Sequence, residues 1–229
     1  MFACLSSLLR SLCLYVKHWI LDHAHPLPQS GLGVYPGTKG SLQASIAMGV
    51  VSAVDIPGMN IFHDYNPFDE TDERTCVWID HERYHGCFAV CRYLGRLWKL
   101  YPVTPESALV VDSLLDLMAA FNRPFICEKT VHTDFVHDHL NAYIGELDAC
   151  MDGEMYLGNM ETVSLADIMW YSCIKHVTLV HDIDEFYDKG EYERFHTWWC
   201  TMSKKEADDA AEDAAEDDAV RMVEDKKNI

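Results

Sequence analysis

The chain has 229 residues, of which 49% are hydrophobic and 11% aromatic, so it can bury the core of one large domain or two ordinary ones. This composition excludes global disorder. The formal net charge of −19 repels phosphate backbones and anionic membrane surfaces, so nucleic acid is not an expected partner.

The cysteines and histidines are scattered along the chain. The nine cysteines form no Cys-x-x-Cys pair, and an odd number in a chain too large to need covalent staples indicates reduced thiols in a reducing compartment. The densest histidine group is His132, His137 and His139. These positions do not share a helical face, so we interpret them as solvated histidines rather than metal ligands.

Residues 1–25 predict an amphipathic helix, because apolar side chains recur at steps of three and four residues. The longest uncharged run of this segment, Met1 to Leu9, is too short to span a bilayer, which takes ~20 residues. The segment fits a mitochondrial presequence and a docking helix equally well. The prolines and glycines that follow, up to Gly33, indicate a linker.

Residues 34–50 predict a short strand that ends at Tyr35, a glycine-rich turn that contains Gly40, and a helix. An acidic stretch, His63 to Arg74, has no clear pattern. The run from Cys76 to Gly95 then predicts an apolar strand, a polar turn at Asp80 to Arg83, and a second helix. The buried stripe of this helix is expected to hold Cys87, Val90, Cys91, Leu94 and Leu97.

Two amphipathic helices are expected next. Thr104 can cap the first one, Pro105 suits the first helical turn, and Glu106 suits the positive end of the helix dipole. Its buried stripe is expected to be Val111, Leu114, Leu115, Met118 and Phe121. In the second helix, over residues 137–151, the buried positions are expected to be Leu140, Ile144, Leu147 and Met151.

Ser164 and Asp167 predict the start of a buried helix. The Ser164 side chain can accept from the backbone N–H of Asp167, and the Asp167 carboxylate can accept from the N–H of Ser164, which makes a capping box. Val163 and Ile168 have the spacing of a hydrophobic staple. The apolar residues that follow indicate that this helix lies in the core.

The last expected helix covers Glu193 to Met202, with three aromatic side chains interpreted as core: Phe195, Trp198 and Trp199. Beyond Ser203 the composition changes to Ala, Asp and Glu, and the last 26 residues hold ten acids against five bases. Acid pairs that recur every four residues repel one another on a helix face, so we expect a solvated tail. Docking of this tail on a basic partner is the alternative.

Several of these motifs resemble the glutathione S-transferase superfamily. Its helical domain contains a buried helix that opens with Ser/Thr-x-x-Asp after a Tyr-Leu-Gly run, similar to Ser164 to Asp167 after Tyr156 to Gly158. Ala89 to Leu94 is similar to the family's Ala-Ile-x-Arg-Tyr-Leu run, and Leu100 to Glu106 to its interdomain linker. The resemblance covers roughly Leu32 to Met202.

The fold class that the resemblance implies is α/β plus all-α. A thioredoxin-like domain is expected over residues 31–97 and an all-helical transferase domain over residues 98–203. Residues 1–30 are then an N-terminal extension and linker, and residues 204–229 an acidic tail.

The resemblance also implies a glutathione site. In tyrosine-type members a phenol at the end of the first strand donates a hydrogen bond to the glutathione sulfur, and Tyr35 matches that position as the expected catalytic residue. The expected glutathione-binding residues are Tyr35, Thr75, Cys76, Gly86 and Cys87. Three of them depart from the family: Gly86 replaces Gln/Glu, Cys87 replaces Ser, and Thr75 replaces a cis-proline. A cis bond before Thr75 would cost about 3 kcal/mol, so a trans bond is expected.

Cys87 has a second interpretation that does not depend on the family. A thiol at a helix N-terminus can act in thiol exchange or redox sensing. The alternative is a half-buried cysteine used as a small hydrophobic side chain. We favour the alternative, because the sequence shows no charged activator beside Cys87.

Two functions therefore stay open. The first is conjugation of the glutathione thiolate to a small hydrophobic electrophile, which in the family would sit between the domains, near Thr104 to Phe121. The second is a non-catalytic interaction or structural module in a larger assembly, as in transferase-like domains of translation elongation and tRNA-synthetase assemblies. Tyr35 favours the first, and the altered positions with the acidic tail favour the second. The resemblance also implies a homodimer; we expect a cytoplasmic or, alternatively, mitochondrial protein without a transmembrane segment.

Overall fold

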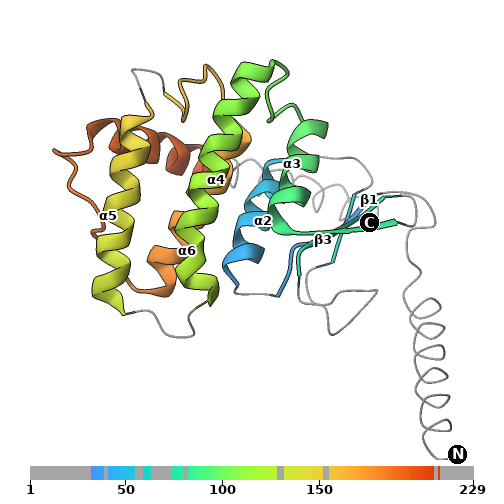
Figure 1. Ribbon diagram of the computed structural model, residues 1–229, viewed down its shortest axis with the longest axis horizontal. Coiled ribbons are helices and arrows are strands. Elements are labelled where there is room, and N and C mark those ends of the chain that lie inside the picture. The colour runs from blue at the N-terminus through green and yellow to red at the C-terminus, as the bar shows by residue number, and fades with distance from the viewer. Residues whose placement is uncertain are drawn as a thin grey trace, which may run out of the picture. The chain divides into compact units, whose positions relative to one another are not determined.

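The computed structural model divides into two compact units, Met1–Tyr101 and Pro102–Ile229 (Figure 1). It describes residues 32–38, 41–54, 59–62, 74–79, 82–127, 132–151, 155–208 and 211. The expected N-terminal helix, the linker up to residue 31, Gly40, residues 63–73, Asp80 and the acidic tail after residue 211 lie outside the described residues. The expected end of the linker was wrong, because Leu32 and Gly33 belong to the first strand, Leu32–Tyr35. The domain boundaries expected at residues 30, 97 and 203 remain predictions.

The first unit is built on a mixed four-stranded sheet with the strand order β2-β1-β3-β4. Its strands are β1 (Leu32–Tyr35), β2 (Asn60–Ile61), β3 (Cys76–Ile79) and β4 (Glu82–His85). β1 runs parallel to β2 and antiparallel to β3, and β3 is antiparallel to β4. This is the thioredoxin-like arrangement that the sequence predicted. Part of the predicted polar turn was wrong: Glu82 and Arg83 belong to β4, because they pair with Ile79 and Trp78.

Two helices that pack against each other complete the described part of this unit: α2 (Leu42–Ala53) and α3 (Cys87–Leu97). α2 begins after Ser41, whose side-chain oxygen accepts a hydrogen bond of 3.1 Å from the N–H of Ala44. Four of the five residues expected on the buried stripe of α3 are buried. Leu97 is the exception, with 49% of its surface exposed, because α3 ends at this residue.

The second unit is helical, as predicted. It contains α4 (Pro105–Cys127), α5 (Thr133–Ala149), α6 (Leu165–Val180) and a helix over residues 193–208. The Thr104 side chain accepts from the N–H of Ser107 at the start of α4. All residues expected on the two buried stripes are buried, but the bounds expected for the second helix, 137–151, were wrong: α5 begins earlier and ends at Ala149, so Met151 is buried just after it. α4 packs on α6, and the indole of Trp170 donates to the carbonyl of Leu114 across this contact, at 2.9 Å.

The capping box at the start of α6 is present. The N–H and the hydroxyl of Ser164 both donate to the carboxylate of Asp167, at 2.8 and 2.6 Å, and the N–H of Asp167 donates to the Ser164 oxygen. Asp167 is fully buried. Burial raises its pKa, and the hydrogen bonds from Ser164, Leu157 and Trp198 partly offset that rise.

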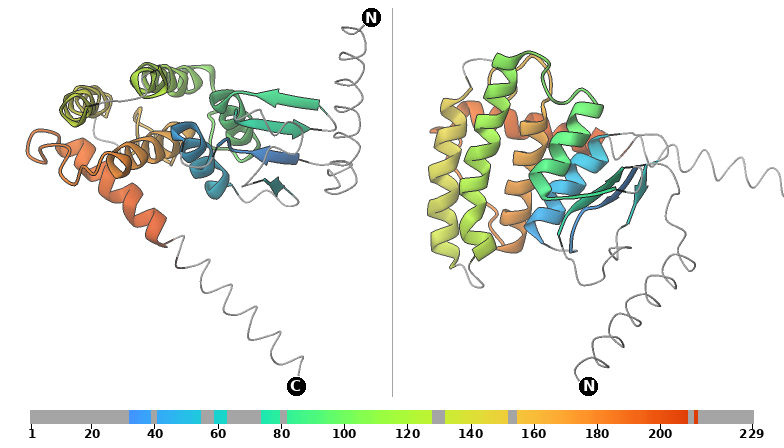
Figure 2. Two further views of the ribbon diagram at one scale, coloured as in Figure 1. Left: turned by 90° about the horizontal axis from the view of Figure 1, so that it is seen from below. Right: turned by 45° about the vertical axis from the view of Figure 1, so that its right-hand side comes forward.

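The helix over residues 193–208 is the terminal helix that the sequence predicted, and it continues past Ser203, where the acidic tail was expected to begin. Figure 2 shows this helix near α6. Phe195 and Trp198 are buried as expected, whereas Trp199 is partly exposed. The N–H of Phe195 donates to the Asp148 carboxylate at 2.8 Å, so a side chain of α5 caps this helix.

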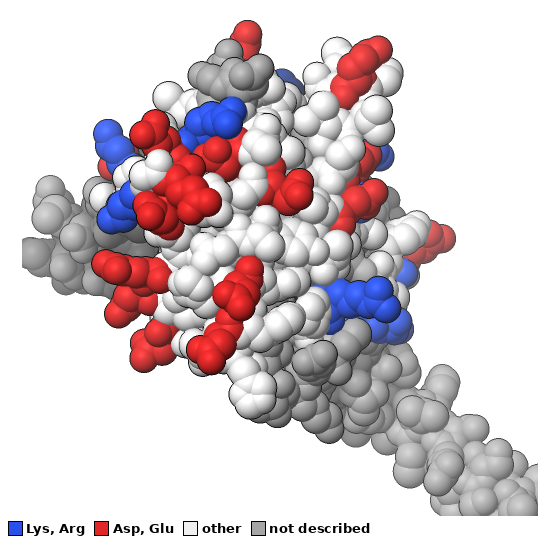
Figure 3. Space-filling model, turned by 60° about the vertical axis from the view of Figure 1, so that its left-hand side comes forward, with Lys and Arg blue, Asp and Glu red and all other residues white. Residues whose placement is uncertain are grey.

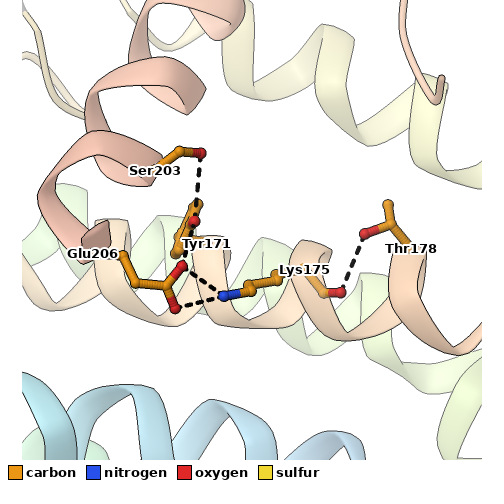
Figure 4. A network of polar contacts seen from close by, with 5 residues as sticks. All are labelled: Tyr171, Lys175, Thr178, Ser203 and Glu206. Atoms are coloured by element: carbon orange, nitrogen blue, oxygen red, sulfur yellow. Dashed lines mark hydrogen bonds and ion pairs between the residues drawn. The ribbon is translucent and has the colours of Figure 1, made fainter. Parts of the chain in front are cut away.

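A polar network holds the far end of this helix on α6 (Figure 4). The carboxylate of Glu206 forms an ion pair of 2.5 Å with Lys175 and accepts a hydrogen bond of 2.9 Å from the hydroxyl of Tyr171. Burial is the main cause that raises the pKa of Tyr171 to about 12. The hydroxyl therefore keeps its proton near neutral pH and stays a donor to Glu206.

The surface reflects the acidic composition. On the face drawn in Figure 3, Asp and Glu side chains are more widespread than Lys and Arg side chains. Within the described ranges, no helix combines the length and the apolar character that crossing a membrane requires.

Candidate functional site

All five residues that the resemblance assigned to glutathione binding lie at one end of the sheet. Tyr35 is the last residue of β1 and pairs with Cys76, the first residue of β3. Thr75 directly precedes β3, Gly86 directly follows β4, and Cys87 is the first residue of α3. Because β1 and β3 are antiparallel, as are β3 and β4, the end of β1, the start of β3 and the end of β4 lie side by side. The structure thus brings together residues that are up to 52 positions apart in the chain.

Thr75 ties these strands to one another. Its hydroxyl donates a hydrogen bond of 2.7 Å to the carbonyl of Pro36, and its own carbonyl accepts one of 2.9 Å from the N–H of Gly86. Thr75 is 1% exposed. No peptide bond of the described residues is cis, so the bond before Thr75 is trans, as the sequence indicated. The Thr75 side chain thus bonds within the protein and is too buried to contact a ligand.

Tyr35 lies in a small apolar cluster. It is 6% exposed and packs with Cys76 and Trp78, while Phe62 packs against the same cluster. The rings of Phe62 and Trp78 meet edge to face, with centroids 5.6 Å apart. Tyr35 therefore contributes most of its surface to packing, and little of it is accessible to a ligand.

The N-terminus of α3 has no side-chain cap among the described residues. Its N-cap is Gly86, which has a φ of 106° and no side chain that could accept from the first-turn N–H groups. These N–H groups and the helix dipole make such an end attractive to an anion. A carboxylate is the kind of ligand that this arrangement accepts.

The thiol of Cys87 is bonded to the neighbouring helix α2. The Sγ atom donates to the carbonyl of Gln43 in α2 at 3.4 Å, and Cys87 is 4% exposed. The neighbouring Cys91 is fully buried, and its hydrogen bond to Cys87 together with burial raises its pKa well above the ordinary value. Both cysteines thus have the surroundings of small buried side chains rather than of reactive thiols.

Ser41 is a candidate that the sequence analysis did not single out. It is partly exposed and caps α2, six residues after Tyr35. Its oxygen accepts from the N–H of Ala44, which leaves the hydroxyl proton for a further acceptor. A signal for it exists in the sequence, since a serine directly before an apolar helical run predicts an N-cap.

The histidines of the densest group make separate contacts. In the described part of the chain, no three His, Cys, Asp or Glu side chains are grouped as metal ligands. His139 stacks between the rings of Phe121 and Phe135, with centroids 5.0 and 5.2 Å away, and its Nε2 atom lies 3.0 Å from the carbonyl of Phe121. His137 contacts Asn141. Six cysteines of the described ranges, at positions 76, 87, 91, 150, 173 and 200, are free thiols.

Several solved structures share this architecture. The sequence matches no protein-family model and no curated protein. Among solved structures, rat hPGDS complexed with a quinoline is similar at a TM-score of 0.59, with 17% identity over 74% of this chain and 89% of that chain. Glutathione Transferase E6 from Drosophila melanogaster is similar at 0.57, with 16% identity over 76% of this chain and 87% of that one.

A third solved structure is the theta class glutathione S-transferase from Xanthomonas axonopodis pv. citri, with glutathione bound. It is similar at a TM-score of 0.55, with 14% identity over 76% of this chain and 92% of that chain. At such low identities the likeness concerns the fold. The chain has the fold of the glutathione S-transferase superfamily, with a thioredoxin-like unit followed by an all-helical unit.

Proposed function

We propose that the protein binds glutathione at the end of the sheet where β1, β3 and α3 meet, and that it transfers the glutathione thiolate to small hydrophobic electrophiles. The observation that carries this proposal is the N-terminus of α3, which has no side-chain cap among the described residues. Solved structures of the same fold support it, since two of those similar to this chain have glutathione bound. A homodimer and the cellular compartment stay predictions.

The α3 N-terminus is proposed to receive the γ-glutamyl carboxylate. A Cβ built on Gly86 would meet no atom closer than 4.0 Å, so a side chain does not fill the space beside this helix end. The first-turn N–H groups can donate to the carboxylate oxygens, and charge-assisted hydrogen bonds of this type contribute about 1.5 to 3 kcal/mol. This contact uses backbone groups, so it survives the replacement of the family's Ser by Cys87.

Two hydroxyls are candidates for holding the glutathione sulfur as a thiolate, which is the nucleophilic form. Tyr35 occupies the position that the resemblance assigns to this role, but it is only 6% exposed. Ser41 is more accessible and lies at the N-terminus of α2, where the helix dipole adds to the stabilisation of an anion. We therefore assign the hydrogen bond to the sulfur to Ser41 and the packing of the sheet to Tyr35.

Binding and turnover test these two assignments. Isothermal titration calorimetry should show binding of glutathione and a much weaker response to cysteinylglycine, which lacks the γ-glutamyl carboxylate. Turnover is measured with glutathione and a chlorodinitrobenzene-type electrophile. Ser41→Ala should lower kcat with little change in glutathione affinity, whereas Tyr35→Phe should retain activity. Loss of activity in a folded Tyr35→Phe variant with full activity in Ser41→Ala would reverse the assignment.

A second function, a non-catalytic interaction or structural module, is favoured by a different observation. Thr75 is tied to Pro36, and Tyr35 is packed among apolar side chains, so two of the family's glutathione positions serve the protein interior here. Glutathione binding without turnover by any variant would support this module. Absence of both binding and turnover would contradict the proposed enzyme outright.

A further inference from the structure

A second cluster of chemically active side chains lies on the helical unit, outside the proposed glutathione site. His196 and Cys200 are four residues apart in the helix over residues 193–208, so they share one face of it. The Cys200 Sγ atom lies 3.8 Å from both ring nitrogens of His196. The Tyr187 hydroxyl lies 2.8 Å from His196 Nδ1, and Cys200 is exposed.

Tyr187 orients the imidazole. Burial, with a smaller contribution from Cys200, raises the pKa of Tyr187 to about 12, so the phenol stays neutral near pH 7. When Nδ1–H of His196 donates to the Tyr187 oxygen, Nε2 carries the lone pair and can take up a proton. Cys200 Sγ lies equally far from both ring nitrogens, and a rotation of this exposed side chain brings the thiol to Nε2, the base that a nucleophilic cysteine requires.

We propose that Cys200 is a covalent attachment site for soft electrophiles of the α,β-unsaturated carbonyl class, with His196 as the base. In this addition, the thiol proton moves to His196 Nε2, and a bond forms between Sγ and the β-carbon. The electron pair of the carbon–carbon π bond moves onto the α-carbon as an enolate, which then takes a proton from the imidazolium. The step needs no oxidant and no leaving group.

A second exposed thiol of the same chain allows the reactivity of Cys200 to be compared within one protein. Among the six cysteines whose side chains are described, Cys150 is the second exposed one and the other four are buried. Partial burial and the nearby carboxylate of Glu146 raise the pKa of Cys150, which disfavours its thiolate. The ionisable group beside Cys200 is the His196 imidazole, whereas the one near Cys150 is the Glu146 carboxylate. Two exposed thiols in one protein are therefore expected to differ in reactivity.

The test is site-resolved labelling of the full chain with a limiting amount of N-ethylmaleimide at pH 7. Peptide mass spectrometry assigns each adduct, so labelling elsewhere in the chain does not enter the comparison. Since general-base assistance contributes ~10²-fold or more, Cys200 should react at least about tenfold faster than Cys150. Equal rates, or faster labelling of Cys150, would overturn the proposal without any variant being needed.

The variant His196→Gln tests whether His196 acts on Cys200 as a base or only through packing. It should slow labelling of Cys200 by about tenfold at pH 7 and leave Cys150 unchanged. At pH 10, where hydroxide in solution can replace the base, the variant and the wild-type protein should react at similar rates. A variant that labels Cys200 at the wild-type rate at pH 7 would overturn the role of His196. The role would also be overturned if Cys200 in the variant labelled more slowly than in the wild-type protein by the same factor at pH 7 and at pH 10. Cys200→Ser should remove this adduct alone.

Discussion

The indole N–H of Trp198 donates a hydrogen bond of 2.8 Å to the buried carboxylate of Asp167. The same Asp167 oxygen accepts from the N–H of Leu157 at 2.8 Å, while the second oxygen accepts from Ser164. One carboxylate thus connects the start of α6, the turn before it and the helix over residues 193–208. A capping box that looks local in the sequence is the meeting point of three segments.

Asp167→Asn is expected to destabilise the helical unit. The amide keeps the size of the side chain but replaces one acceptor oxygen with a donor, so N–H groups of Ser164 or Leu157 lose their partner. A buried group left without its partner costs about 1 to 3 kcal/mol, and more when a charge is involved. Chemical denaturation should show a loss of ~2 to 4 kcal/mol. Asp138→Asn, at an exposed position on α5, is the control and should change the stability by less than about 0.5 kcal/mol. Equal effects of both substitutions would contradict the role of Asp167.

The ion pair between Glu206 and Lys175 should make a pH-dependent contribution. Burial raises the pKa of Glu206, but the hydrogen bonds from Lys175 and Tyr171 and the Lys175 charge outweigh it, so the net pKa is lowered from 4.5. A carboxylate with a lowered folded-state pKa stabilises the fold above its unfolded pKa and loses this effect as the pH falls. Because the pair is about half exposed, its contribution is at most about 1 kcal/mol.

Glu206→Gln tests this contribution by thermal unfolding. At pH 7 the variant should melt a few degrees below the wild-type protein, and the difference should vanish as the pH falls below 4.5. A difference of the same size at pH 7 and at pH 3 would show that the side chain acts through packing and not through its charge.

Gly158 and Gly145 should respond in opposite directions to substitution by alanine. Gly158 has a φ of 68°, and a Cβ there would lie 2.4 Å from Val110 Cγ1, so Gly158→Ala should cost about 2 kcal/mol or more. Gly145 lies inside α5, and a Cβ there would meet Tyr192 at an ordinary 3.6 Å. Gly145→Ala should therefore stabilise the protein by about 0.5 to 1 kcal/mol. Denaturant titration measures both, and a neutral Gly158→Ala would contradict the contact with α4.

Cys87→Ser should strengthen glutathione binding. A hydroxyl is a stronger hydrogen-bond donor than a thiol, and at the first residue of α3 a rotation of the side chain can take it from the Gln43 carbonyl to the proposed carboxylate position. One added hydrogen bond contributes ~1 kcal/mol, or about a fivefold lower Kd in calorimetry. Cys91→Ser is the matched control, because Cys91 lies on the same helix but is fully buried. Unchanged affinity in a folded Cys87→Ser variant would count against the proposed carboxylate position.

The sequence by itself determined the features that depend on near neighbours in the chain. The capping box at Ser164 and the cap at Thr104 join residues three positions apart, and the buried stripes of α4 and α5 follow from the helical period. The same local logic failed at element ends. Leu97 keeps the period of α3 but lies in its last turn, and Arg83 looks like a turn residue until β3 pairs with it.

Only the tertiary structure decided which distant side chains meet. Trp198 donates to Asp167 from 31 positions away, and Thr75 donates to Pro36 from 39 positions away. The four-residue spacing of His196 and Cys200 is visible in the sequence, but Tyr187 joins them from the loop before their helix. Periodicity places a residue on a face, whereas the partner on the other side of that face is set by how the elements pack. The fold was therefore predictable from local motifs through the family that they resemble, while the roles proposed for Ser41 and Cys200 needed the packed chain.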